Sequence, residues 1–190
     1  MDAREGSKAP QLNPRVQRTK AHVLAVARDT LAEVGPAELT YTLLSATSGV
    51  TRQTLYRHWP TREALLAEIV LTSADVPYPH PGTDPGTVVT EYLQSLRAGM
   101  SDPATAAALT SLAAHASTDP NSDAALRAIV ADRRAALNAL LIDTGRNIDA
   151  SQFARLAGPV IFQCLIARVE PADRFIEALV TDWQQAPPTS

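Results

Sequence analysis

The sequence predicts an all-α protein of about nine helices. Apolar residues recur three or four positions apart along most of the 190-residue chain, which is the spacing of one helix face. Residues that begin or end helices bound these stretches, and no stretch alternates apolar and polar residues as a half-buried strand does. The expected helices form two groups, separated by one proline-rich segment.

The N-terminal group contains four expected helices. Residues 1–15 combine Gly, Ser and Pro with scattered charge, which predicts a disordered basic arm. The first helix covers residues 19–34 and ends at Gly35-Pro36, because glycine suits the residue after a helix and proline cannot continue one. Threonine can cap each of the next three helices, which we expect at residues 41–48, 52–58 and 62–72.

Residues 73–87 hold four prolines and two glycines, a density at which no regular element survives. We interpret this segment as a linker or long loop. It divides an N-terminal domain of residues 16–72 from a C-terminal domain of residues 88–186.

Five further helices are expected in the C-terminal domain. Apolar stripes mark the first and third, and the dipeptide Asp102-Pro103 opens the second as an N-cap followed by proline. A long apolar segment and a final amphipathic segment supply the last two. Their approximate ranges are 89–100, 103–117, 120–141, 151–169 and 171–184.

Composition excludes several classes of protein. The one cysteine, Cys164, can form neither an internal disulfide nor a cysteine-based zinc site. No apolar run approaches the roughly 18 residues that span a bilayer, and the first ten residues do not resemble a secretory signal. We therefore expect a soluble cytoplasmic protein with no metal site, no cofactor and no membrane partner.

The net charge of −3 hides an asymmetry along the chain. Residues 1–66 carry nine Lys and Arg against six Asp and Glu, whereas residues 67–190 carry eight against fourteen. The N-terminal third is therefore +3 and the remainder −6. A basic end is a cue for binding a polyanion, although a solvated face produces the same imbalance.

The residues between Thr40 and Leu66 carry the functional signal. Two short helices are joined by Ser48-Gly49-Val50, which is the layout of a helix-turn-helix motif. The second helix is too polar for a core element, and it exposes side chains that donate hydrogen bonds: Arg52, Gln53, Thr54, Tyr56, Arg57 and His58.

The stretch GVTRQTLYRHWPTREALL resembles the DNA-binding signature of the TetR family of bacterial transcription regulators. The resemblance covers about residues 18–70. Departures from the usual pattern are mild: Trp59 stands for phenylalanine, Arg62 for lysine, and Ser45 and Ser48 for alanine. Arg62 keeps the positive charge, so the departures leave the DNA-binding interpretation intact.

The resemblance implies a role for each matching residue. Thr40 and Thr51 would cap helices beside phosphates, and Arg62 would contact a phosphate. Base edges in the major groove would be read by Arg52, Gln53 and Thr54. Tyr56 and His58 would contact the backbone or the bases, whereas Leu55 and Trp59 should be core residues. The implied partners are a palindromic double-stranded DNA operator, a second copy of the chain and an unknown small-molecule effector.

A dimer interface is expected near the C-terminus. Residues 157–168 are apolar on every side, and a helix of this kind must be covered all round. Members of the family dimerise through their last two helices. We assign five residues to the interface or its edge, although intramolecular core packing fits each of them equally well: Phe162, Ile166, Phe175, Leu179 and Trp183.

Family members bind a small molecule in the C-terminal domain, in a pocket that is mostly apolar. Eight residues are candidates to line such a pocket, and ordinary core packing is the competing interpretation for each. They are Tyr92, Leu96, Met100, Leu112, His115, Leu137, Phe162 and Gln163.

We expect a regulator, by family default a repressor that a small molecule releases from its operator. The alternatives are an activator, or a regulator of the same fold that needs no ligand. An enzyme is the main competing class, and Cys164 would be its nucleophile, but this thiol lies in an apolar helical run. The four histidines lack the spacing of metal ligands, and no phosphate-binding glycine loop is present. We therefore expect no catalytic site.

Overall fold

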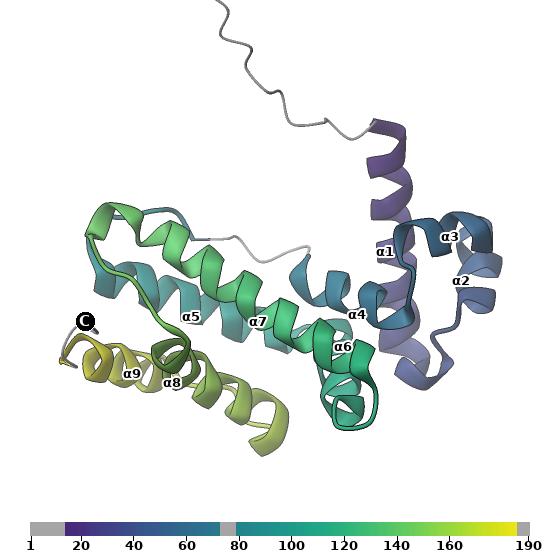
Figure 1. Cartoon of the computed structure of the whole chain (residues 1–190). Coiled ribbons are helices and arrows are strands. Elements are labelled where there is room, and N and C mark those ends of the chain that lie inside the picture. The colour runs from purple at the N-terminus through teal and green to yellow at the C-terminus, as the bar shows by residue number, and fades with distance from the viewer. Residues whose placement is uncertain (1–13, 73–78, 186–190) are drawn as a thin grey trace, which may run out of the picture.

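The structure is a computed structural model that describes residues 14–72 and 79–185. The described residues form nine α-helices and no strand, which confirms the all-α prediction (Figure 1). The helices are α1 (Pro14–Val34), α2 (Tyr41–Ser48), α3 (Arg52–His58), α4 (Arg62–Leu71), α5 (Pro85–Ser101), α6 (Pro103–His115), α7 (Pro120–Leu140), α8 (Ala150–Ile161) and α9 (Asp173–Gln185). Short helical turns are η1 (Pro36–Glu38) and η2 (Ile142–Thr144), and α8 continues as a π-helix, η3 (Phe162–Ala167).

Threonine caps position the helix-turn-helix as the sequence predicts. The hydroxyl oxygens of Thr40, Thr51 and Thr61 accept hydrogen bonds from backbone amides at 3.2, 3.3 and 3.1 Å. Gly49 ends α2 with φ at 69°, a left-handed conformation that glycine adopts without strain. Local sequence therefore fixes both ends of α2 and the start of α3.

Several element boundaries differ from the expected ones. Helix α1 begins at Pro14, inside the expected arm, because proline suits the first turn of a helix. Helix α5 begins at Pro85, inside the expected linker, because the Asp84 carboxylate accepts the Thr87 amide at 2.7 Å. The last helix begins at Asp173 rather than directly after Glu170. The remaining arm residues 1–13, linker residues 73–78 and residue 186 lie outside the described residues.

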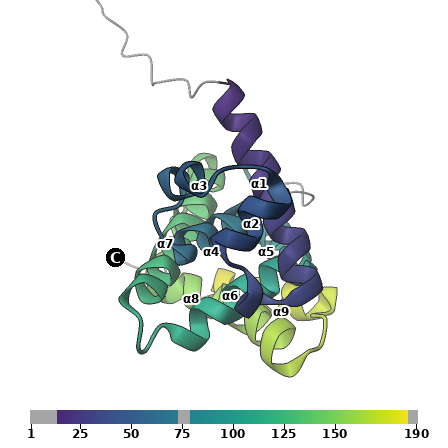
Figure 2. The same cartoon turned by 90° about the vertical axis from the view of Figure 1, so that its right-hand side faces the viewer.

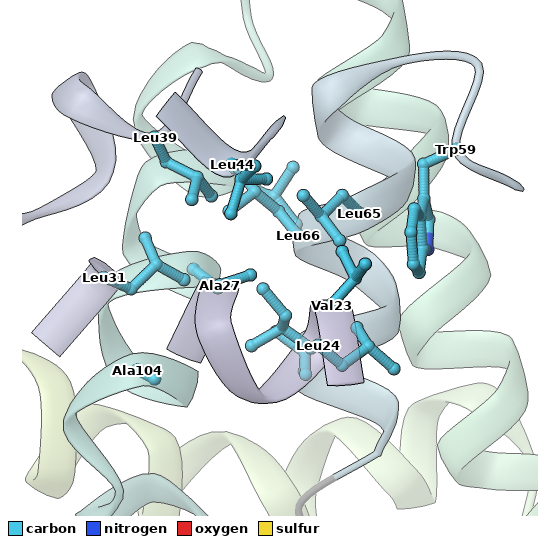
Figure 3. Close-up of a cluster of buried hydrophobic side chains, with 14 of the residues drawn as sticks. Val23, Leu24, Ala27, Leu31, Leu39, Leu44, Trp59, Leu65, Leu66 and Ala104 are labelled. Atoms are coloured by element: carbon cyan, nitrogen blue, oxygen red, sulfur yellow. The ribbon is translucent and has the colours of Figure 1, made fainter. Parts of the chain in front are cut away.

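Helices α1 to α4 form a head at one end of the molecule, and α5, α7, α8 and α9 form a body at the other (Figures 1 and 2). Two hydrophobic cores follow this division. The first joins α1 to α4 with Ala104, Ala108 and Leu112 of α6 and Ile129 of α7. Figure 3 shows part of it, with Val23 and Ala27 of α1 beside Leu65 and Leu66. The head therefore shares its core with α6 and is not a separate globule.

The second core lies between α5, the C-terminal half of α7, α8 and α9. Fully buried residues at its centre include Val89, Leu93 and Leu137. The ring of Tyr92 meets that of Phe153 edge to face, with centroids 6.4 Å apart. This core fixes α8 and α9 side by side.

One stretch contradicts the expectation that no segment is long and apolar enough to span a bilayer. Residues 150–167, which form α8 and η3 as one continuous helix, reach that length with a mean hydropathy of 1.2, and 28% of the stretch is buried. The expectation rested on uninterrupted runs of apolar residues, whereas a membrane-spanning helix tolerates the scattered Ser, Gln and Arg of this segment. A core helix of a soluble protein passes the same criterion.

Candidate nucleic-acid interface

Helix α3 has one buried apolar side and one polar side that faces solvent. Leu55 is fully buried and Trp59, directly after the helix, is 1% exposed, as expected for core residues. On the opposite side four residues are exposed and two are half-buried: Arg52, Gln53, Tyr56 and Arg57, then Thr54 and His58. This face offers cations and hydrogen-bond donors, which suit base edges and phosphates.

The C-terminal end of α3 is fixed to α1 and α4 through Trp59. The indole Nε1 donates to Glu68 Oε2 at 2.7 Å. Lys20 Nζ lies 2.8 Å from Glu68 Oε1 and 5.6 Å from the centroid of the indole ring. Tryptophan at this position thus adds a hydrogen bond that the phenylalanine usual in the family lacks, and it holds the exposed face of α3 in one orientation.

A notch of about 350 Å³ opens beside α3, between the N-termini of α2 and α4. Three expected DNA-contacting residues line it: Thr40, Tyr56 and Arg62. Tyr41 and Thr61 also line it. Because both threonines are N-caps, backbone N–H groups without helical partners lie at two helix N-termini here. Such groups, with a nearby guanidinium, favour an anion such as phosphate.

The other expected contacts lie apart from the notch, on α3 itself. Arg52 and Gln53 are exposed in its first turn, where base-reading side chains of recognition helices lie. Thr51 Oγ1 lies 3.0 Å from Thr54 Oγ1, so these two hydroxyls already share a hydrogen bond.

Tyr41 is a supporting residue that the sequence analysis missed. Its hydroxyl lies 2.6 Å from the carbonyl oxygen of Trp59 and 2.7 Å from that of Thr61. Its ring meets Tyr56 edge to face, with centroids 4.6 Å apart. Burial raises the pKa of Tyr41, with smaller contributions from Tyr56 and Glu63, so the hydroxyl stays protonated as a donor. The sequence feature that could have identified Tyr41 is an aromatic residue directly after an N-cap, in a motif whose next helix carries an exposed tyrosine.

Arg62 also has a structural role beside the implied phosphate contact. Its Nε donates to the carbonyl oxygen of Leu39 at 3.2 Å, and its guanidinium also donates to that of Pro36. Arg62 therefore ties η1 to the start of α4. A guanidinium has five N–H groups, so a phosphate in the notch would use the remaining ones.

The pKa of His58 lies below its usual value, which favours the neutral imidazole in the free protein. Desolvation lowers its pKa most, and the positive charges of Arg57 and Lys20 lower it further, against a smaller opposite effect of Glu68. A neutral imidazole beside DNA would gain charge if the phosphates raised its pKa again.

The body contains an apolar cavity of about 120 Å³ where the two cores meet. Tyr92, Leu96 and Met100 of the expected ligand-pocket set line it. It has few polar groups, and one of them, the Tyr92 hydroxyl, donates to the carbonyl oxygen of Arg133 at 3.1 Å. The other lining residues are Val70, Leu71, Ser95, Gly99, Leu109, Leu126, Ile129, Val130, Arg133, Phe153, Ala157 and Ile161.

Five residues of the expected pocket set do not line this cavity. Leu112 and Leu137 fill the first and second cores, because α6 packs on α1 and α4 and α7 packs on α5. His115 is exposed on a groove between α6 and the head. Phe162 and Gln163 border a groove on the outer side of α8 and η3.

The outer side of α8 and η3 carries an exposed apolar surface. Phe162, Ile166 and Val169 are 56%, 69% and 57% exposed. Phe162 and Val169 also border the outer groove, together with the half-buried Phe175 of α9. We call Phe162, Ile166, Val169 and Phe175 the outer apolar face.

Two further residues of the expected interface lie deeper. Leu179 is half-buried. Trp183 is only 6% exposed and belongs to the second core, with the Arg146 guanidinium carbon 4.6 Å from its ring centroid. Its position supports the core interpretation for Trp183.

Cys164 does not have the environment of a nucleophile. Burial raises the pKa of its thiol, as does Glu170, and Arg97 only partly opposes them. A raised pKa favours the protonated thiol, and the protonated thiol is a poor nucleophile. In residues 14–72 and 79–185, no group of three His, Cys, Asp or Glu side chains is placed to hold a metal ion.

A capped helix-turn-helix head packed against a helical body is the architecture of a DNA-binding transcription regulator. Residues 23–69 match the family model for bacterial regulatory proteins of the tetR family. The TetR family transcription regulator SCO0332 has the same fold, with a TM-score of 0.71 and 28% identity, over 90% of this chain and 100% of that one. The chain therefore has a tetR-type region at residues 23–69 and is similar over most of its length to a TetR family transcription regulator.

Two other solved structures show how widely the fold is shared. A TetR transcription regulator from Haloarcula marismortui is 18% identical over 91% of this chain and 100% of its own, with a TM-score of 0.61. The multidrug binding protein EbrR, crystallised with imidazole, is 14% identical over 90% of this chain and 97% of its own, with a TM-score of 0.57. No curated protein matches the sequence.

Proposed function

We propose that this protein is a homodimeric repressor that binds a palindromic DNA operator through α3 and leaves it when a small molecule enters the body. The observation that carries the proposal is the combination on the head of a polar α3 face and the adjacent notch. One supplies groups that read base edges and the other supplies groups that hold phosphates.

In the proposed complex α3 lies in the major groove. Arg52 would donate two hydrogen bonds to a guanine, and Gln53 would pair with an adenine. The notch would hold a phosphate against Thr40, Tyr56 and Arg62, which fixes the register of α3 without reading sequence. Cytoplasmic location follows as part of the same proposal, since the operator is there.

The outer apolar face supports the homodimer. Three large apolar side chains that are each more than half exposed cost free energy in water, which a second copy would relieve. A two-fold axis through this face would pair equivalent helices of the two copies. Two heads would then reach half-sites about 34–36 Å apart, or further on a longer operator.

The cavity supports ligand control. It is apolar with few polar groups, which is the usual character of a small-molecule site. A protein of the same fold, EbrR, is described as a multidrug binding protein. Any such ligand must bind the form with misplaced heads more tightly than the DNA-competent form.

Selection from a pool of random DNA duplexes tests the proposal. We expect enrichment of an inverted repeat, bound by two copies of the chain, with an affinity that falls steeply as salt rises. Exposure of the bound complex to a library of small apolar compounds should release DNA with at least one of them. A selection that yields no common sequence would contradict the proposal.

A further inference from the structure

The C-terminal end of α4, where the head meets the body, is held by two arginines from different helices. Arg28 of α1 approaches it from the head. Its Nη2 donates to the carbonyl oxygens of Ile69 and Thr72, the latter at 2.9 Å. Ile69 lies in the last turn of α4 and Thr72 is its C-cap, where the helix itself supplies no donor for these carbonyls.

Arg28 also reaches the turn between α5 and α6. Its Nη1 lies 2.7 Å from Asp102 Oδ2, and the Arg28 side chain is only 15% exposed. Asp102 is the N-cap of α6, and its carboxylate also accepts hydrogen bonds from Thr105. Burial opposes the negative charge, but Thr105 and Arg28 together hold the pKa of Asp102 below its usual value. Arg28 therefore connects α1, α4 and α6 through one guanidinium.

Arg133 of α7 approaches the same end of α4 from the body. Its Nη2 donates to the carbonyl oxygen of Val70 at 2.6 Å. Three carbonyls of the last α4 turn are thus satisfied by two guanidinium groups, one from the head and one from the body. Cations at a helix C-terminus are also favoured by the helix dipole.

The cavity touches both arginine contacts. Val70 and Leu71, at the end of α4, line it together with Arg133 itself. On another wall Gly99 and Met100 line it, and they lie just before Asp102, the partner of Arg28. An occupant of the cavity therefore lies against the groups that fix the end of α4.

The cavity also lies between the two cores. Ile129 of its lining belongs to the first core, and Tyr92 and Phe153 belong to the second. Close-packed cores do not deform smoothly, so a displacement at their junction moves one relative to the other. The head moves with the first core.

We propose that Arg28 and Arg133 are the positioning residues that convert occupancy of the cavity into the orientation of the DNA-reading head. Filling the cavity displaces Arg133 from Val70 and shifts the α5–α6 turn that carries Asp102, so the end of α4 leaves its position. The carbonyls of Ile69 and Val70 are partly buried, and losing their donors is costly, so α4 moves to a second arrangement in which they are bonded again. This inference rests on the proposed ligand control.

A cavity-filling substitution tests the coupling without a known ligand. Leu96→Trp places an indole in the cavity from α5. We expect it to lower affinity for the selected duplex about tenfold, a common size for coupling between two sites. In an Arg133→Met or Arg28→Met background the same substitution should change affinity less than about twofold, because its effect passes through these residues.

Matched variants separate coupling from loss of stability. Arg97→Met removes a comparably buried arginine that pairs with Asp173 in the body, away from α4, and should leave the tenfold effect intact. Arg133→Lys keeps a donor for Val70 and should restore part of the effect. Should Leu96→Trp not fold, Val130→Trp enters from the exposed rim of the cavity and replaces it.

A second readout needs neither DNA nor a dimer. Spin labels on Ala46→Cys in α2 and Ala139→Cys in α7, with Cys164→Ser, report the distance from head to body within one chain. Leu96→Trp should shift this distance, and Arg133→Met should abolish the shift. An equal effect of Leu96→Trp in all backgrounds would overturn the coupling and leave ligand control standing. Unchanged affinity and distance in every background would overturn both.

Discussion

The notch on the head depends on a tyrosine that contacts three segments, and its removal has a calculable effect. Tyr41→Phe keeps the ring against Tyr56 but removes the hydroxyl shared by the carbonyls of Trp59 and Thr61. Both carbonyls flank Pro60, which has no N–H to offer. The turn from α3 to α4 therefore loses its donor and gains none.

The loss of this donor should cost about 1–2 kcal/mol of unfolding free energy, within the range for buried groups left unpaired. For a chain of this length that corresponds to a fall in Tm of roughly 2–8 °C. Tyr41→Val removes the ring as well, and the lost edge contact adds about 0.5–1.5 kcal/mol. Denaturant and thermal unfolding of the whole chain measure both variants.

Affinity for DNA should depend on the ring of Tyr41 rather than on its hydroxyl. With the ring in place, Tyr41→Phe should weaken binding to the selected duplex by no more than about threefold, whereas Tyr41→Val should weaken it about tenfold, because Tyr56 loses its support. Tyr56→Phe is the opposite control: the Tyr56 hydroxyl is exposed and is proposed to contact DNA, so its loss should lower affinity without lowering stability. If Tyr41→Phe is as stable as the parent, the bridging role assigned to Tyr41 is wrong.

Three further outcomes are expected. Ile166→Glu on the outer apolar face should convert the proposed dimer to monomer in sedimentation experiments, whereas Val34→Glu, at a valine on the head that is 52% exposed, should not. Affinity for duplex DNA should rise as pH falls below neutral, because phosphates favour the protonated form of His58, whose pKa is lowered in the free protein. His58→Gln should flatten that profile. Removing the charge of Arg62 should reduce the slope of log affinity against log salt by about 1, and an unchanged slope would remove Arg62 from the phosphate contacts.

Much of the head could be predicted from sequence because its determinants are local. Threonine caps, a left-handed glycine and prolines fix the ends of α2, α3 and α4 within a residue or so. Helix α5 begins earlier than predicted. The proline-rich stretch contains Asp84-Pro85, an N-cap followed by a proline in the first helical turn. In a segment with several prolines, the start of the helix depends on which proline occupies its first turn.

The body was less predictable because its side chains are assigned by long-range packing. Leu112 and Leu137 have the apolar character of pocket residues, but they fill cores that only the packing of α6 and α7 defines. The helical spacing does not distinguish Arg28 and Arg133 from other charged residues, yet both contact the end of α4. No periodicity marks a residue that connects two cores.

Arg52→Ala tests the proposal that α3 reads DNA sequence. Its affinity for the selected duplex, measured beside that for a duplex of scrambled sequence, should fall about tenfold or more for the first and little for the second. Arg127→Ala removes the same charge from an exposed ion pair on α7 and should affect neither. Unchanged discrimination by Arg52→Ala would contradict the assignment of α3 as the reading helix.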